Sequence, residues 1–440
     1  VYKDGEEFRD FANNSILFFR LLIVILSFPA LGLILYLLLG RPNTTKGMRQ
    51  RYEQIDRVVY KYIKQDDTVF EQIEKEDISI ANQMRYIKDY ARFPAYKNEG
   101  IEYYDDALAG FNAQLEALEK AEKFIFMEYF IVENGESFRE LEEILIRKAK
   151  EGVEIRLLYD DFGSVAKIGR EFARNLQRKG IRCYPFNPAS PVLNLFMNHR
   201  DHRKIMVIDG KVGYTGGYNL ADEYFDLVRP YGKWKDTGLR LEGAAVRNLT
   251  SIFLELWYLQ TGETEPADDY LDRCDHVKSE GLVLPFGDDP LGEERLAENV
   301  YLNLMNQANY SLYIMTPYLI LTDEMTHSLG LAAKRGVDVR IITPGIPDKK
   351  TVYAVTRSYY ASLVNKGVRI FEYTPGFLHA KQCICDGELA MIGTSNLDYR
   401  SLYLHFENNV LLYNCDAVEA MAADFQETMA VCREVTGQYR

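Results

Sequence analysis

Cysteine is scarce in this sequence, and its distribution excludes a disulfide-stabilised fold. The 440-residue chain has six cysteines, and they are scattered along it. Only Cys383 and Cys385 lie close together, within an apolar run that is typical of a packed strand. We therefore expect a reducing compartment. No Cys, His and Asp residues recur at the spacing of metal ligands, so the sequence predicts neither a metal nor a cofactor.

Positive charge is also in deficit. The 52 Lys and Arg residues are outnumbered by 65 Asp and Glu, which gives a net charge of −13. This balance argues against a general nucleic-acid binder, because neutralising phosphates requires clustered basic residues. An anionic lipid remains a compatible substrate if basic residues gather at its binding site. A globular chain of this length predicts two or three domains.

Charge is missing entirely from the run 21–39. As a helix this run would be about 28 Å long, close to the thickness of a bilayer core. A buried core helix would rarely be apolar on every face. A signal peptide usually has a shorter apolar region and a small-residue cleavage site. We therefore predict a transmembrane helix over about residues 18–40, within a membrane segment formed by residues 1–45.

The flanking charges predict the orientation of that helix. Arg41, Lys46 and Arg49 follow it, whereas Asp4 and Glu6 precede it. The positive-inside rule then places the rest of the chain in the cytoplasm. Residues 46–100 have mixed charge and partial helical periodicity, and we expect a juxtamembrane helical linker. Its basic residues would lie either against anionic headgroups or in solvent.

Histidine is rare as well, yet two of the six occur in the same motif. The segments 202–210 and 379–387 both read H-x-K-x4-D-G. Each is followed by a glycine-containing return that ends in asparagine, at Asn219 and Asn396. At ordinary residue frequencies such a match twice in one chain is not coincidence.

The motifs belong to a longer internal repeat. Segment 149–156 matches 333–340 almost residue for residue, and 179–182 matches 366–369. Each half alternates short Val/Ile-rich strands with helices that end at a glycine. This pattern predicts an α/β fold with two tandem α/β sandwich domains, at 101–280 and 281–440. Pseudo-twofold symmetry between them would bring the two motifs together.

Each motif is expected to form a β-hairpin. The Asp-Gly pairs that begin at Asp209 and Asp386 are strong turn signals, and we expect these aspartates to stabilise the turns. Because side chains alternate along a strand, His202 and Lys204 share one face, as do His379 and Lys381. A simple hairpin register places Gly217 opposite His202 and Thr394 opposite His379. Small residues there would let backbone amides approach a phosphate.

Two histidines, two lysines and two asparagines suit a phosphodiester. The lysines and amides would stabilise phosphate charge, one imidazole would attack phosphorus, and the other would transfer protons. A nucleophilic histidine needs an acceptor on its other nitrogen. We expect Asp236 to serve His202 and Glu407 to serve His379. The alternative is that both carboxylates lie on the surface.

These residues resemble the phospholipase D superfamily, whose signature is the paired H-x-K-x4-D-x6-G-[GS]-x-N motif. Bacterial cardiolipin synthases are the most similar group, and supporting stretches are 198–204, 345–350, 373–381 and 393–401. The resemblance implies a bacterial membrane enzyme with phospholipase D-like domains facing the cytoplasm. It also implies that His202 forms a phosphatidyl intermediate and His379 acts as acid and then base. Two phosphatidylglycerol molecules would give cardiolipin and glycerol.

The same residues are compatible with other functions. A hydrolytic phospholipase D, another phosphatidyltransferase, a nuclease of the same superfamily and a non-enzymatic membrane scaffold are the alternatives. Lys349 and Lys350 would either attract the second anionic lipid or be a solvated pair. The sequence leaves the oligomeric state open, a homodimer included.

Overall fold

The computed structural model describes residues 43–188, 198–263, 265–271, 280–292 and 294–439. The predicted transmembrane helix at about 18–40 lies outside these residues. Within the described part of the chain, no helix combines the length and the apolar character needed to cross a membrane.

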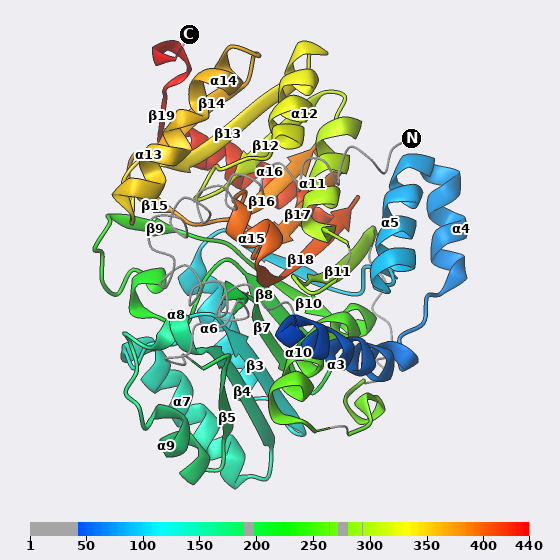
Figure 1. Ribbon diagram of the computed structural model, residues 1–440, viewed down its shortest axis with the longest axis vertical. Helices are drawn as coiled ribbons and strands as arrows, with labels where there is room; N and C mark the ends of the chain where they lie inside the picture. Colours follow the sequence, from blue (N-terminus) through cyan, green and yellow to red (C-terminus); the bar gives the residue numbers. More distant parts are fainter. Residues whose placement is uncertain (1–42, 189–197, 264, 272–279, 293, 440) are drawn as a thin grey trace, which may run out of the picture.

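The first half of the repeat forms a seven-stranded sheet with the order β2-β10-β8-β7-β3-β4-β5 (Figure 1). Strands β3 and β4 are buried on both faces, as expected for parallel strands covered by helices. The elements of this half are β2 (Ile101–Tyr104), α6 (Ala107–Leu118), β3 (Phe124–Tyr129), α7 (Glu136–Lys150), β4 (Glu154–Asp160), α8 (Asp161–Ser164), α9 (Phe172–Arg178), β5 (Arg182–Phe186), β7 (Lys204–Ile208), β8 (Val212–Gly216), β10 (Gly238–Glu242) and α10 (Val246–Thr261).

The second half contributes most of a ten-stranded sheet with the path β1-β11-β18-β17-β16-β12-β13-β14-β19. Its core repeats the order of the first sheet, with β12 and β13 parallel and the motif hairpin antiparallel beside them. The elements are β1 (Tyr96–Lys97), β11 (Leu282–Asp288), α11 (Leu296–Gln307), β12 (Ser311–Met315), α12 (Asp323–Lys334), β13 (Asp338–Pro344), α13 (Lys350–Ser358), α14 (Tyr360–Val364), β14 (Arg369–Tyr373), β16 (Gln382–Cys385), β17 (Leu389–Gly393), α15 (Tyr399–Tyr403), β18 (His405–Tyr413), α16 (Asp416–Ala430) and β19 (Cys432–Glu434).

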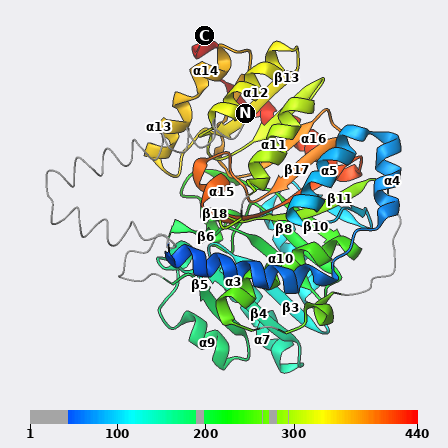
Figure 2. The same cartoon turned by 45° about the vertical axis from the view of Figure 1, so that its right-hand side comes forward.

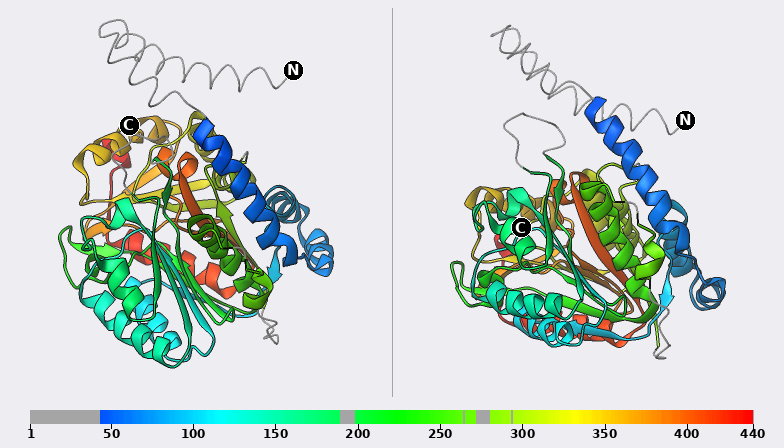
Figure 3. Two further views of the ribbon diagram at one scale, coloured as in Figure 1. Left: turned by 60° about the horizontal axis from the view of Figure 1, so that its bottom comes forward. Right: turned by 90° about the horizontal axis from the view of Figure 1, so that it is seen from below.

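Two helices at equivalent places in the repeat join the halves. Helix α10 packs on β3 and β7 of the first sheet and on β11 of the second, and its residues from Asn248 to Leu259 are all buried. Helix α16 packs on strands of the second sheet and on β2 of the first. Figures 2 and 3 show the two halves stacked into one body around these contacts. Each half therefore completes the core of the other.

The segment before residue 100 folds onto that body. Helix α3 (Asn43–Val59) lies along α10, and α5 (Ile78–Ala91) packs on α11 and β11, with α4 (Asp67–Glu76) outside it (Figure 2). Val59, Ile73 and Met84 are completely buried in these contacts. The apolar faces of the helices are therefore part of the main core.

Both motif hairpins differ by one residue from the predicted register. Ile208 pairs with Val212 and Cys385 with Leu389, so each turn contains three residues instead of two. Asp209 and Asp386 adopt positive φ angles of 55°, followed by glycines with positive φ. The predicted positions of Gly217 and Thr394 opposite the histidines are therefore wrong, because the extra turn residue shifts both return strands.

Two short parallel strand pairs connect the halves at the motifs. Strand β6 (Arg200–Asp201) pairs with the start of β18, and β9 (Lys233–Lys235) pairs with β15 (Gly376–Leu378). These strand pairs directly precede His202 and His379 in the sequence. Each histidine therefore lies next to a strand of the opposite half.

Candidate active site

His202 lies at the junction of the two halves. Its backbone N–H donates to the carbonyl oxygen of Phe406 at 2.9 Å, and its Nδ1 lies 2.9 Å from Glu407 Oε2. Glu407 is fully buried on β18, and its carboxylate also accepts hydrogen bonds from the hydroxyls of Thr394 and Ser401. A carboxylate on Nδ1 fixes the tautomer in which Nε2 keeps its lone pair.

His379 has the equivalent arrangement with the halves exchanged. Its backbone N–H donates to the Lys235 carbonyl at 2.7 Å, and its Nδ1 lies 2.6 Å from Asp236 Oδ2. The predicted pairing of carboxylates with histidines is therefore wrong, since Asp236 holds His379 and Glu407 holds His202. The physical reason is the pairing of β9 with β15 and of β6 with β18, which carries each carboxylate across to the other motif.

Both motif lysines are buried beside their histidines. Lys204 Nζ donates to the carbonyl oxygen of His202 at 2.5 Å, and Lys381 Nζ donates to that of His379. Lys381 Nζ also lies 2.8 Å from His379 Nδ1. That nitrogen cannot accept from the lysine while it donates to Asp236, and the shorter contact to an ionised carboxylate is the stronger of the two. The ammonium groups are thus left with donor capacity for a ligand.

Burial lowers the pKa of Lys204 to about 8 and that of Lys381 to about 7, despite the nearby carboxylates. Lys204 is one of the groups that lower the pKa of Lys381, so the two cations are electrostatically coupled across the interface. Two buried cations held close together are stabilised by a bound anion. This electrostatic arrangement favours a ligand such as a phosphodiester.

Burial makes both histidines hard to protonate. Burial lowers the pKa of His379 to about 4, with Lys381 lowering it further and Asp236 opposing the shift. Burial lowers the pKa of His202 well below its usual value. Burial alone would raise the pKa of Glu407 and Asp236, but the adjacent histidines hold both below their usual values. Both imidazoles are therefore neutral at pH 7 without substrate, and both carboxylates are ionised.

Gly217 and Thr394 contact the carboxylates instead of the histidines. A Cβ atom at Gly217 would lie 1.9 Å from Asp236 Oδ1, so only glycine leaves room for that carboxylate. At the equivalent position of the second motif, the Thr394 hydroxyl donates to Glu407 Oε2 at 2.5 Å. The two halves are thus not equivalent, because the two carboxylates receive different support.

The motif aspartates lie away from the histidines and connect strands. Asp209 accepts from the backbone N–H groups of Glu122, Lys123 and Phe124 at 2.7–2.9 Å, at the start of β3. Asp386 accepts in the same way from Asn309, Tyr310 and Ser311 at 2.7–2.8 Å, at the start of β12. Each aspartate therefore fastens the hairpin tip to the neighbouring strand.

The two asparagines have different surroundings. Both polar atoms of Asn219 have a partner, since its Oδ1 accepts from the Ile131 N–H and its Nδ2 donates to the Tyr224 hydroxyl. Asn396 is 4% exposed, and its Oδ1 has no hydrogen-bond partner. Asn219 therefore acts on the shape of the site, whereas Asn396 retains a free polar atom.

Lys349 and Lys350 are exposed near the second motif. Lys349 lies 3.6 Å from Asp348 and 5.5 Å from the centre of the Tyr318 ring. Tyr318 in turn lies near Phe377, whose ring is 5.8 Å from that of His379. The rings of Tyr318 and Phe377 thus lie between Lys349 and His379. Lys350 is the first residue of α13.

Four contacts of the site escaped sequence reasoning. Ser401 donates to Glu407, and the rings of Phe130, Trp234 and His405 lie 4.9–5.6 Å from a motif histidine. The sequence spacing could have identified two of these residues. Trp234 and His405 each precede a site carboxylate by two residues, the spacing that puts side chains on one face of a strand.

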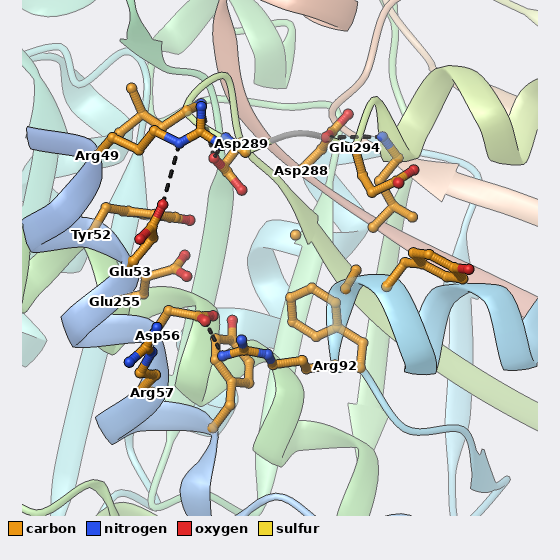
Figure 4. Close-up of a pocket in the computed structure, with 18 of the residues that line it drawn as sticks. Arg49, Tyr52, Glu53, Asp56, Arg57, Arg92, Glu255, Asp288, Asp289 and Glu294 are labelled. Atoms are coloured by element: carbon orange, nitrogen blue, oxygen red, sulfur yellow. Dashed lines mark hydrogen bonds and ion pairs between the residues drawn. The ribbon is translucent and has the colours of Figure 1, made fainter. Parts of the chain in front are cut away.

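A separate charged pocket of about 420 Å³ lies between α3, α5, α10 and the loop after β11 (Figure 4). Its acidic and basic side chains pair with one another, as in the contacts Arg92–Asp56 and Arg49–Glu53. Arg203 connects it to the candidate active site, because this guanidinium contacts Glu255 at 3.2 Å and the carbonyl oxygen of Glu407 at 3.3 Å. Arg203 lines the pocket, whereas the motif histidines and lysines do not.

Two α/β halves that exchange histidine partners across their interface define a phospholipase D-like protein. The fold agrees with the crystal structure of phosphatidylserine synthase from Haemophilus influenzae, with a TM-score of 0.63 over 81% of this chain and 91% of that one, at 16% identity. The family model described as "Cardiolipin synthase, PLD-like domain" matches residues 115–257 and 301–429.

Relatives extend this match over nearly the whole chain. A cardiolipin synthase from Geobacillus sp. is 37% identical over 93% of this chain and 82% of its own length. An uncharacterised protein from Streptococcus mutans is 40% identical over 94% of this chain and 90% of its own. The chain therefore belongs to the cardiolipin synthase family with phospholipase D-like domains.

Proposed function

We propose that this chain is a phosphatidyltransferase that makes cardiolipin from two phosphatidylglycerol molecules. The observation that carries the proposal is the pair of buried histidines, each paired through Nδ1 with a buried carboxylate of the opposite half and flanked by a buried lysine. Family membership supports the same activity. The lysines would bind the phosphodiester oxygens and stabilise the charge that grows in the transition state.

In the first step, His202 Nε2 attacks phosphorus of one phosphatidylglycerol. A phosphorus–nitrogen bond forms, and the phosphorus–oxygen bond to the glycerol headgroup breaks. Protonated His379 gives its proton to the departing glycerol oxygen. The products of this step are free glycerol and a phosphatidyl group on His202.

In the second step, neutral His379 takes the proton from a hydroxyl of the second phosphatidylglycerol. That oxygen attacks phosphorus, the bond to His202 breaks, and cardiolipin leaves. This division of roles is the one that the family resemblance implies, with His202 as nucleophile and His379 as acid and then base. The bound anionic phosphodiester favours the protonated imidazole that the first step requires.

Residues 18–40 would hold the enzyme at the bacterial membrane where its lipid substrates lie, with the domains 101–280 and 281–440 in the cytoplasm. The sequence of that segment supports the proposal through its uncharged run. A variant lacking residues 1–42 should remain folded and lose sedimentation with phosphatidylglycerol vesicles. Unchanged sedimentation would contradict the anchor.

The activity test uses the full chain and vesicles of phosphatidylglycerol. We expect cardiolipin and glycerol in equal amounts. Phosphatidic acid without cardiolipin would mean that water is the acceptor and would make the chain a hydrolytic phospholipase D. Absence of any lipid turnover, with binding to the vesicles retained, would favour a membrane scaffold.

A further inference from the structure

A third imidazole lies beside the carboxylate that holds His202. His405 begins β18 two residues before Glu407, so both side chains point to the same side of the strand. The His405 Nδ1 atom is 3.5 Å from Glu407 Oε1, and the His405 ring centre is 5.3 Å from that of His202. One ligating atom from each of the three residues lies within 4.8 Å of the others.

The nitrogen that faces Glu407 is not satisfied by hydrogen bonding. The His405 side chain is only 10% exposed, and its buried Nδ1 has only the long 3.5 Å contact with Glu407 Oε1 and no hydrogen bond of normal geometry. Leaving a buried polar atom unpaired is costly, so such an atom calls for an explanation. Its other nitrogen, Nε2, accepts at 3.4 Å from the side chain of Arg400, which is exposed and free to turn into solvent.

The other half of the molecule shows that packing alone does not require this nitrogen. Trp234 precedes Asp236 as His405 precedes Glu407, and its ring centre lies 5.6 Å from that of His379. An indole fills the place of the imidazole there. The indole Nε1 is likewise buried without a hydrogen-bond partner, but it is only a donor, so Trp234 cannot ligate a metal beside Asp236 as His405 can beside Glu407.

We propose that His202, His405 and Glu407 bind a divalent transition metal such as Zn²⁺. Two imidazoles and one carboxylate are a donor set that zinc uses with a fourth position open. Donor atoms around tetrahedral zinc lie roughly 3.3 Å apart. His202 Nδ1 lies 2.9 Å from Glu407 Oε2 and His405 Nδ1 lies 3.5 Å from Oε1 of the same carboxylate. The donor separations of up to 4.8 Å would have to shrink by roughly 1.5 Å to reach the zinc spacing.

Metal binding and phosphatidyl transfer should exclude each other, an inference that rests on the proposed function. A neutral imidazole that gives its Nδ1 lone pair to a metal carries its proton on Nε2. His202 then has no lone pair with which to attack phosphorus. Zn²⁺ would therefore inhibit the enzyme at its nucleophile, and a chelator would reverse the inhibition.

Direct binding is tested with Co²⁺, whose visible absorption reports tetrahedral nitrogen and oxygen ligands. The full chain in detergent micelles is titrated with Co²⁺ and then with Zn²⁺ as competitor. We expect bands that Zn²⁺ abolishes and that are lost in His405→Trp, which copies the other half, and in His405→Asn. His327→Asn, at an exposed histidine of α12, is the matched control and should keep the bands. Circular dichroism verifies the fold of each variant.

Inhibition is tested by measuring cardiolipin formation against Zn²⁺ concentration, with each variant compared with its own zinc-free rate. The half-inhibitory concentration should rise by at least about tenfold in the folded His405 variants. The proposal would be overturned if the full chain showed no Co²⁺ bands. It would also be overturned if the bands and the inhibition were unchanged in both His405 variants. If the bands depend on His405 but the chain has no transferase activity even without zinc, the metal site would be supported and the proposed function refuted.

Discussion

At the scale of single residues, some motif residues react and others stabilise the fold. The histidines and lysines gather at one buried site, whereas Asp209 and Asp386 tie hairpin tips to neighbouring strands. The carboxylates that contact the imidazoles come from outside the motifs. The reacting groups were visible in the sequence because alternation along a strand fixes which side chains share a face.

The pH dependence follows from the buried lysines. Because the pKa of Lys381 is about 7 and that of Lys204 about 8, both are charged below these values and neutral above them. Loss of protonated His379 already lowers kcat/KM above its pKa of about 4, and we expect a steeper fall as pH rises through 7–8, because neutral lysines no longer attract the phosphodiester. The fall in kcat should occur at higher pH, since bound substrate favours the ammonium form. A kcat/KM that stays constant up to pH 9 would contradict this assignment.

Gly217→Ala tests the position of Asp236. The added methyl group overlaps Asp236 Oδ1, so the carboxylate must leave His379. We expect transfer activity to fall by a factor of about 100 or more, the usual contribution of general acid–base catalysis. Gly437→Ala, where a Cβ meets nothing within 4 Å, is the control and should keep its activity. Full activity in Gly217→Ala would mean that Asp236 is dispensable.

At the scale of elements, the order of strands and helices followed from the repeat, whereas details of pairing did not. The Asp-Gly signals located both hairpins, but a turn of three residues instead of two moved each return strand by one position. The partners of the carboxylates depend on β6–β18 and β9–β15 contacts between segments far apart in sequence. Local periodicity contains no information on such contacts.

Asp209→Ala tests whether that side chain is structural. It removes the acceptor of three backbone N–H groups, which should cost about 2–3 kcal/mol in the free energy of unfolding. Urea unfolding measures this loss. Asp209→Asn keeps an acceptor oxygen and tolerates the positive φ angle, so its loss should be smaller. If kcat per folded Asp209→Ala molecule fell by a factor of 100, the aspartate would belong to the reaction.

At the scale of the whole molecule, neither half holds a complete site. His202 depends on a carboxylate of the second half, and His379 depends on one of the first. Helices α10 and α16 fix the halves against each other. Lys235, next to Asp236, adds a buried ion pair with Asp424 of α16 at 2.5 Å.

Lys235→Met should therefore weaken the interface and the site together. Asp424 would be left buried without its cation, at a cost of about 3–5 kcal/mol in stability. Thermal unfolding and cardiolipin formation measure the two effects. Lys233→Met, at an exposed position of the same strand, should change neither appreciably. Equal stability of the two variants would show that the Lys235–Asp424 pair does not hold the halves together.

The most direct measurement identifies the atom that carries the phosphatidyl group. The full chain is mixed with phosphatidylglycerol labelled in its phosphate and rapidly denatured at alkaline pH, because phosphorus–nitrogen bonds on histidine hydrolyse in acid. Peptides are then mapped by mass spectrometry. We expect label on the peptide that contains His202 and none in His202→Asn. Label on His379, or cardiolipin formation by His202→Asn at the normal rate, would contradict the mechanism.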